Sequence, residues 1–215
     1  MATFLDDLPP IDWSDLMTAS AQTQSALRRL GADKKALREL VYAVETTPRL
    51  LAKCEKHALD DKIVIYDDLE RGFRIRLRLA TSDQHERAHQ HRFSFSTLIL
   101  RGMYHQAWYY TDQVLDENVD VAAIKPVCLR DEPAGSAFTI HHNVIHATMA
   151  DPDTISLIMR GPAAKDRAII THKETGRVWF RYGEKDESEE RRKKVQMPLE
   201  TYLEWRNKME GYGLI

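Results

Sequence analysis

The chain contains 215 residues, of which 43% are hydrophobic and 30% are charged, and its formal net charge at pH 7 is −2. This composition excludes a disordered chain and is enough for one domain with a substantial core. The balanced charge, the lack of a long apolar run and the acidic start MATFLDDLPP predict a cytoplasmic protein with no nucleic-acid partner and no membrane partner.

The N-terminal part of the chain has the apolar spacing of helices. Asp12 or Ser14 can cap a segment that ends at Gly31, and Asp33 can cap the next one. A third, shorter helix opens at a proline, a residue suited to the first helical turn. We therefore expect residues 1–60 to form a helical segment that packs on the rest of the fold.

From Lys62 the apolar period changes to two, which is typical of strands. Short β-prone runs follow one another with Gly, Asp, Asn or Pro between them. They lie near residues 62–68, 73–80, 93–100, 105–111, 127, 136–140 and 154–159. Many short strands with turn signals favour an antiparallel sandwich or jelly roll, which we place at residues 61–182.

The last part of the chain, residues 183–215, begins with the charge run DESEERRKK. Such a run predicts a solvated loop or helix surface. An amphipathic pattern follows from Pro198, with Leu199, Leu203 and Met209 as the expected buried side of a C-terminal helix. We expect all three parts to form a single structural domain.

Three histidines have the spacing of metal ligands. His89 and His91 stand one residue apart at the start of a β-prone run, and His146 lies inside a second run. Residues i and i+2 of a strand point to one face, so the first two imidazoles can meet one ion. If His146 arrives on a facing strand, three nitrogens hold the metal and leave open coordination positions, as in catalytic sites.

Two segments resemble the two motifs of the cupin superfamily. The segment from His89 to Gly102 resembles the first motif, His-x-His, a spacer, usually Glu, and then Gly. The segment from His141 to His146 resembles the second, Pro-x-Gly-x-x-His, with Asn143 in place of Gly. Asn tolerates the left-handed turn that Gly would otherwise provide.

The resemblance covers roughly residues 62 to 180. It implies a mainly β fold, namely a cupin-type jelly-roll β-barrel with an N-terminal helical segment and a C-terminal helix. Phe95 stands where the usual glutamate ligand would be, so the resemblance implies a three-histidine site. Whether Glu86 or His142 also joins the site stays open.

Among cupins, this ligand set is similar to that of the thiol dioxygenases, in which three histidines hold iron. Those proteins also have a strand Ser-x-His-x-Tyr after the last ligand. Here the corresponding strand begins at Ser156, and Ile158 and Arg160 replace the His and the Tyr. The difference argues against oxidation of cysteine itself.

Arg160 and Tyr109 are the candidate catalytic residues. Strand parity can direct Arg160 into the barrel, where a guanidinium needs an anion such as a substrate carboxylate or phosphate. Two alternatives carry the same weight. The side chain of Arg160 pairs with an internal Asp or Glu, or it points out of the barrel. A tyrosine hydroxyl near the metal can donate a proton or a hydrogen bond, and we assign this role to Tyr109.

Three further arginines, Arg74, Arg76 and Arg78, alternate with apolar residues along one strand. If the apolar face packs on the N-terminal helices, the basic face lines the barrel interior. We expect the basic face to be solvated instead, because three unpaired buried charges are prohibitively costly.

These patterns predict a mononuclear non-haem iron(II) oxygenase or dioxygenase that acts on a small carboxylate-bearing molecule. The resemblance favours iron, and Ni, Cu, Zn and Mn are alternatives for such a site. Two other functions stay open: a lyase or isomerase that uses the metal as a Lewis acid, and a non-catalytic cupin that binds a small ligand. The expected partners are an anionic substrate, O2 and a second copy of the chain in a homodimer.

Overall fold

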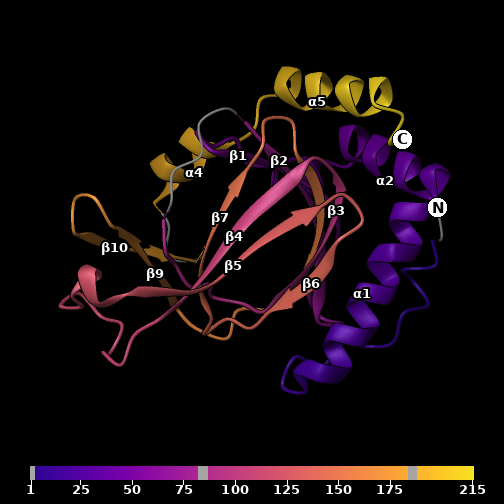
Figure 1. Ribbon diagram of the computed structural model, residues 1–215. Coiled ribbons are helices and arrows are strands. Elements are labelled where there is room, and N and C mark those ends of the chain that lie inside the picture. The colour runs from indigo at the N-terminus through magenta and orange to yellow at the C-terminus, as the bar shows by residue number, and fades with distance from the viewer. Residues whose placement is uncertain (1–2, 82–86, 184–187) are drawn as a thin grey trace.

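The computed structural model describes residues 3–81, 87–183 and 188–215. It is mainly β, with antiparallel sheets that enclose a barrel, as predicted. Helices α1, α2 and α5 lie on one side of the barrel, and the hairpin of β9 and β10 projects on the other (Figure 1). In these three ranges, no helix combines the length and the apolar character needed to cross a membrane.

The N-terminal segment forms three helices. They are α1 (Leu16–Ala32), α2 (Lys34–Thr46) and α3 (Pro48–Leu51). The cap of α1 is Asp15, which accepts a hydrogen bond from the Thr18 amide, so the expected caps at Asp12 or Ser14 are wrong by one to three positions. The helix ends at Ala32, one residue after the predicted end at Gly31. A Cβ at Gly31 would lie 2.7 Å from a methyl carbon of Leu98, so the glycine lets α1 pack closely on β3.

One sheet contains five strands in the order β1-β2-β8-β3-β6. The strands are β1 (Asp60–Asp68), β2 (Phe73–Ala80), β3 (Phe95–Arg101), β6 (Ala137–Ile140) and β8 (Ile155–Arg160). Its apolar face packs on the helices and forms the largest core, to which β2 contributes Phe73, Ile75, Leu77 and Leu79. Alternation along β2 therefore sends the arginines of that strand into the barrel.

The opposite sheet is built from β5-β4-β7 and the hairpin β10-β9. Its strands are β4 (Met103–Tyr110), β5 (Lys125–Pro133), β7 (Ile145–Ala150), β9 (Arg167–His172) and β10 (Arg177–Tyr182). An extended segment at His89 joins the two parts, since it forms bridges to His146 of β7 and to Ile170 of β9. The strands β9 and β10 were not among those predicted from the sequence. A short turn, η1 (Val121–Ala123), lies in the connection before β5.

The chain ends with α4 (Glu189–Val195) and α5 (Leu199–Gly211). The exposed α4 lies in the charge run, which agrees with the predicted solvated helix surface. The predicted buried side of α5 is confirmed for Met209, which is buried, and for Leu203, which packs partly buried on the core, but it is wrong for Leu199, which is 46% exposed. Tyr202 and Trp205, which we did not predict, are also buried. Hydrogen bonds from Tyr202 to the Val41 carbonyl and from Trp205 to Asp61 decide this orientation.

From β2 onwards the chain passes repeatedly between the two sheets, which is the connectivity of a jelly roll. The fold class is therefore confirmed: a mainly β jelly-roll barrel with an N-terminal helical segment and a C-terminal helix. The barrel is lined by side chains of both sheets, and these side chains form the candidate site.

Candidate metal centre

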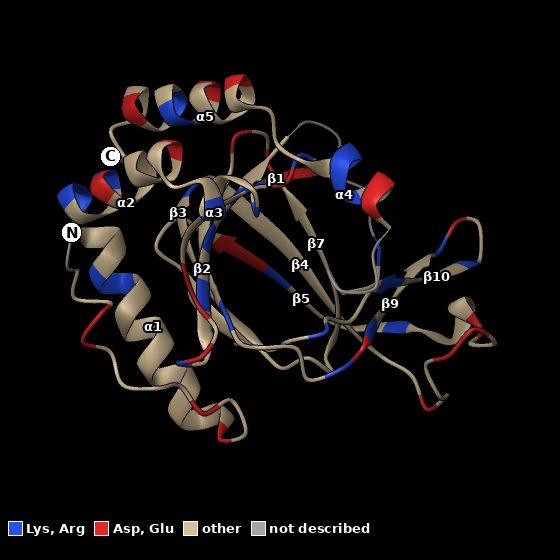
Figure 2. Ribbon diagram, turned by 180° about the vertical axis from the view of Figure 1, so that it is seen from behind, with Lys and Arg blue, Asp and Glu red and all other residues tan. Residues whose placement is uncertain are grey.

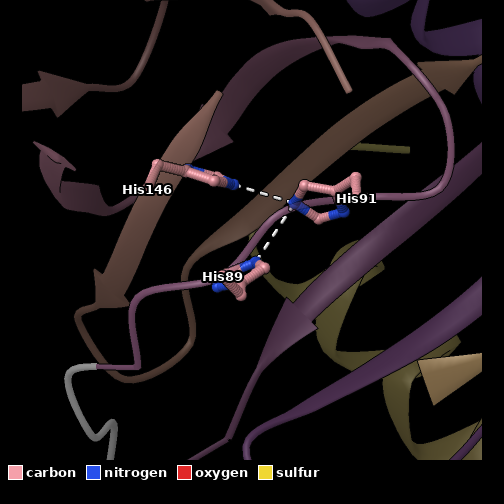
Figure 3. A group of neighbouring side chains, drawn as sticks. All are labelled: His89, His91 and His146. Atoms are coloured by element: carbon pink, nitrogen blue, oxygen red, sulfur yellow. Dashed lines mark hydrogen bonds between the residues drawn. The ribbon is translucent and has the colours of Figure 1, made fainter. Parts of the chain in front are cut away.

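His89, His91 and His146 point toward one another at the wall of the barrel (Figure 3). The Nε2 atom of His91 lies 3.1 Å from Nε2 of His89 and 2.8 Å from Nε2 of His146. One ligand nitrogen from each residue lies within 4.8 Å of the others. The three rings therefore converge, as the spacing predicted.

The backbone brings the two ligand segments together directly. His89 and His146 exchange both amide-to-carbonyl hydrogen bonds, at 2.8 and 2.9 Å. We expected the His-x-His pair to begin the strand that forms β3. This expectation is wrong, because β3 begins only at Phe95. The pair begins in the sheet of β7 and precedes the crossing to β3. His89 consequently lies beside His146 in its own sheet, and not on a facing strand.

A hydrogen bond and burial keep these imidazoles in the neutral form that can bind a metal. The Nδ1 atom of His89 lies 2.8 Å from the Arg87 carbonyl, which makes Nδ1 the protonated nitrogen and leaves the Nε2 lone pair free. Burial lowers the pKa of His89 to about 4 and the pKa values of His91 and His146 well below their ordinary range. All three are neutral near pH 7, the form that binds metals.

The spacing of the nitrogens fits a single ion. Three nitrogens at about 2.1 Å from one metal lie roughly 3 Å apart in common coordination geometries. The Nε2–Nε2 separations of 2.8 and 3.1 Å agree with this value. The donor set of three neutral imidazoles suits iron, nickel, copper and zinc. His89, His91 and His146 are therefore the residues that would hold a metal.

In the described part of the chain, no carboxylate belongs to this cluster. Phe95 takes the place next to the histidines, with its ring 4.6 Å from that of His91. His142 does not join the site, since its Nδ1 is directed to the hydroxyl of Ser94 at 3.2 Å. Glu86 lies outside the described residues.

The triad lies on the wall of a cavity of about 760 Å³. Among the described residues, eleven lysines and arginines line this cavity but only three carboxylates do. Figure 2 shows basic positions in blue along β2, and all of them are arginines. A cavity of this size and charge can enclose a small organic anion beside the histidines.

The arginines of β2 do not form the solvated face that we predicted. Arg74, Arg76 and Arg78 all line the cavity, whereas we expected a solvated face. Two of them form ion pairs with β1: Arg74 pairs with Asp67 at 2.5 Å and Arg78 pairs with Asp60 at 2.7 Å. These ion pairs reduce the cost of burial, and our prediction, which assumed three unpaired charges, did not include them.

Arg160 also lies on the cavity wall, which is one of the two directions that the sequence left open. One terminal nitrogen donates to the Gly161 carbonyl at 2.9 Å, and the guanidinium carbon lies 4.5 Å from the centroid of the Phe93 ring. No carboxylate of the described residues pairs with it. Burial, together with the charges of Arg74 and Arg76, lowers the pKa of Arg160 to about 9.

Tyr109 is not at the cavity, so the structure does not support our assignment for it. It pairs with Ile145 on β7, one residue from His146, and therefore points to the opposite face of the sheet. There it packs in an apolar cluster with Val119 and Ile124. Two tyrosines of the described residues line the cavity, Tyr104 and Tyr182. On β4, Tyr104 lies opposite Ala150 of β7, so it shares the face of His146.

No protein-family model matches the chain, and no curated protein matches it. Solved structures with partial similarity include KdgF from Halomonas sp., at 14% identity and a TM-score of 0.37 over 52% of this chain and 88% of that chain. An RmlC-like cupin from Shewanella frigidimarina NCIMB 400 has 16% identity and a TM-score of 0.36 over 53% and 86% of the two chains. Hydroxypropylphosphonic acid epoxidase from S. wedmorenis has 14% identity and a TM-score of 0.35 over 49% and 51%. Similarity at this level carries no information on activity.

Proposed function

We propose that this protein is a mononuclear, metal-dependent oxygenase of the cupin type that acts on a small carboxylate-bearing molecule. The observation that carries the proposal is the convergence of three neutral imidazole nitrogens on the wall of a large, cationic cavity. His89, His91 and His146 would hold iron(II). Such an ion, when bound, would supply open coordination positions for substrate and dioxygen.

The chain's own residues would bind and orient the substrate. Arg160 has no carboxylate partner in the described part of the chain and faces the cavity, so it would anchor an anionic group of the substrate as a bidentate fork. Phe93 and Phe95 lie beside His91, at 5.9 and 4.6 Å between ring centroids, and would exclude water from that side of the site.

Oxygen consumption tests the oxidative proposal. Iron(II)-loaded protein should bind one metal per chain by elemental analysis and consume oxygen when candidate carboxylic acids are added. His91→Ala should lose both the metal and the oxygen uptake, whereas His172→Ala, at the end of β9, should retain both. Stoichiometric metal without oxygen uptake across a broad panel of acids would refute the oxygenase.

A Lewis-acid function is the second candidate, and the ligand set favours it specifically. Three neutral imidazoles leave the full double charge on a divalent ion, which strengthens polarisation of a bound carbonyl or hydroxyl. A lyase or isomerase of this kind would convert substrate with zinc or nickel in place of iron and without oxygen. Failure to retain any metal would instead favour a non-catalytic ligand-binding cupin.

A further inference from the structure

Two carboxylates of the cavity wall are already engaged with cations. Glu55 pairs with Lys62 at 3.0 Å and with His57 at 2.7 Å. Asp60 pairs with Arg78 at 2.7 Å. Although burial opposes ionisation of these carboxylates, Lys62 lowers the pKa values of both Glu55 and Asp60, so both remain charged. They have little capacity left to neutralise further cations.

The other carboxylates in and around the cavity are engaged as well. Asp67 pairs with Arg74 at 2.5 Å and also with Lys53, so this group of three retains a positive charge. Glu189 of α4 pairs with Lys193 at 2.9 Å. The cationic side chains that remain in the cavity therefore have no spare carboxylate among these residues.

Arg76 and Arg160 take part in none of these ion pairs. Glu55 offsets part of the charge of each guanidinium, but only at a distance longer than that of an ion pair. The side chain of Arg76 makes no hydrogen bond or ion pair within the described ranges, and its Nε is a buried donor without a partner. Among the residues that the structure describes, Arg160 donates only to the Gly161 carbonyl. Both guanidinium groups lie over one ring, that of Phe93, at 5.6 and 4.5 Å from its centroid.

Strand register explains why the two charges meet. Arg76 lies opposite Ile158 of β8, and Arg160 is two residues further along β8, so the arginines are diagonal neighbours on one face. Two like charges so placed repel one another and are costly to bury. Such an arrangement is stabilised when a divalent anion binds between them.

We infer that Arg76 and Arg160 together bind a phosphoryl group, and that the substrate is an organic phosphate or phosphonate with a metal-binding carboxylate or hydroxyl at its other end. The second part of this inference rests on the proposed function, since it takes the cavity to be a substrate site. The Phe93 ring that carries both guanidinium groups has its centroid 5.9 Å from that of His91. A small molecule can therefore reach from the arginines to the histidines.

A phosphoryl group suits this pair better than a single carboxylate. One carboxylate has one negative charge, and its two oxygens are satisfied by one guanidinium fork. A phosphate monoester carries between one and two negative charges at pH 7 and has three terminal oxygens. It can therefore accept from both arginines and neutralise both.

Inorganic phosphate is the probe that tests the inference. It should be titrated at pH 7.5 and constant ionic strength into full-length protein treated with a chelator, so that no metal contributes to binding. We expect saturable binding at one site, at least about tenfold tighter than that of acetate, because charge-assisted hydrogen bonds from two guanidinium groups are involved. Binding no tighter than acetate would overturn the inference, and tighter binding of malonate would reassign the site to dicarboxylates.

Three variants locate the site. Arg76→Gln and Arg160→Gln should each weaken phosphate binding by about tenfold or more, and Arg160→Lys should give an intermediate loss because it keeps the charge without the fork. The matched control is Arg181→Gln, which removes one charge from the cavity lining on β10, and it should change the affinity by less than about threefold. Equal losses in all variants would show a diffuse charge effect and refute the site.

Thermal unfolding provides a second measurement. Without phosphate, Arg76→Gln should unfold at the same or a higher temperature than the wild type, because it removes a cation with no ion-pair partner in the described ranges. Phosphate should raise the melting temperature of the wild type but not of Arg76→Gln. A lower melting temperature together with an unchanged phosphate response would contradict the role of Arg76. Neither measurement depends on metal or oxygen, so failure here is distinct from failure of the oxygenase proposal.

Discussion

Phe95 limits the set of ligands that the site could offer to a metal. It is only 5% exposed and packs against His91, at the position where the cupin resemblance places a glutamate. A carboxylate there would reduce the charge on a bound metal and occupy one more coordination position. The phenyl ring instead keeps the ligand set neutral and one side of the site apolar.

Phe95→Glu should therefore convert the site to three nitrogens and one oxygen. We expect zinc affinity to rise by at least about tenfold, the size typical of changes around a metal site. The metal-free variant should be less stable than the wild type, because its carboxyl is buried without a partner. Competition with a chelating dye measures the affinity. Phe95→Gln is the control of similar shape, and an equal gain in that variant would contradict the ligand role.

At the scale of elements, Lys165 connects the two segments that carry the ligands. Its Nζ donates to Gln90 Oε1 at 2.8 Å, to the His142 carbonyl at 3.1 Å and to Asn143 Oδ1 at 3.2 Å. Gln90 in turn donates to the Asn143 carbonyl at 2.8 Å. Lys165 is thus a positioning residue, which holds the His-x-His segment against the turn before β7.

Lys165→Met should lower metal affinity by about tenfold while all three histidines remain, because the two segments lose their shared partner. Zinc titration measures this loss, and the melting temperature of the metal-free protein shows whether the fold is retained. Lys173→Met removes an exposed lysine from the turn between β9 and β10 and should have no effect. Equal affinity of the Lys165 variant and the wild type would show that the backbone bridges suffice.

Gly102 joins β3 to β4 and cannot be replaced without cost. Its φ is +77°, and a Cβ there would lie 2.3 Å from Thr154 Oγ1 and 2.9 Å from Thr154 Cα. Gly102→Ala should reduce the free energy of unfolding by about 2 to 4 kcal/mol, from left-handed strain together with overpacking. Chemical denaturation measures this change.

Gly135 is the matched control for Gly102, because its φ is +91° but a Cβ at this position would meet no neighbouring atom within 4 Å. Gly135→Ala should cost only the strain, about 1 to 2 kcal/mol. Equal losses at the two positions would show that the contact with Thr154 is unimportant.

At the scale of the molecule, α5 ties the helical layer to the barrel. Trp205 donates to Asp61 of β1 at 2.7 Å, and both residues are buried. Trp205→Phe should reduce stability by about 1 to 3 kcal/mol, since it leaves a buried carboxylate with one partner fewer. Helix and strand signals should shift together in circular dichroism. Leu199→Ala, at an exposed position of α5, should have almost no effect.

A homodimer stays a prediction for the whole molecule. β5 is an edge strand and exposes Val127 and Leu129, at 65% and 76%. Edge strands of this kind favour pairing between copies. Light scattering should give twice the mass of the chain, and Leu129→Lys should shift the equilibrium toward the monomer. A monomeric wild type at high concentration would contradict the prediction.

Much of the architecture follows from local pattern. Alternating apolar residues predicted most strands, helical spacing predicted the N-terminal and C-terminal helices, and the spacing of His89 and His91 predicted a shared direction. These predictions succeed because they depend on periods of 2 and 3.6 residues, which are properties of the backbone. Hairpin β9-β10 was not identified, although its strands are as long as β8.

The tertiary structure decided which side of each strand faces the cavity. Parity shows that Arg74, Arg76 and Arg78 share a face, yet only the packing of helices on the opposite face of β2 turns them inward. In the same way, the register of β4 against β7 places Tyr104 inside and Tyr109 outside. Local periodicity is encoded in neighbouring residues, whereas inward direction and register depend on contacts between distant segments, and a single sequence does not display those.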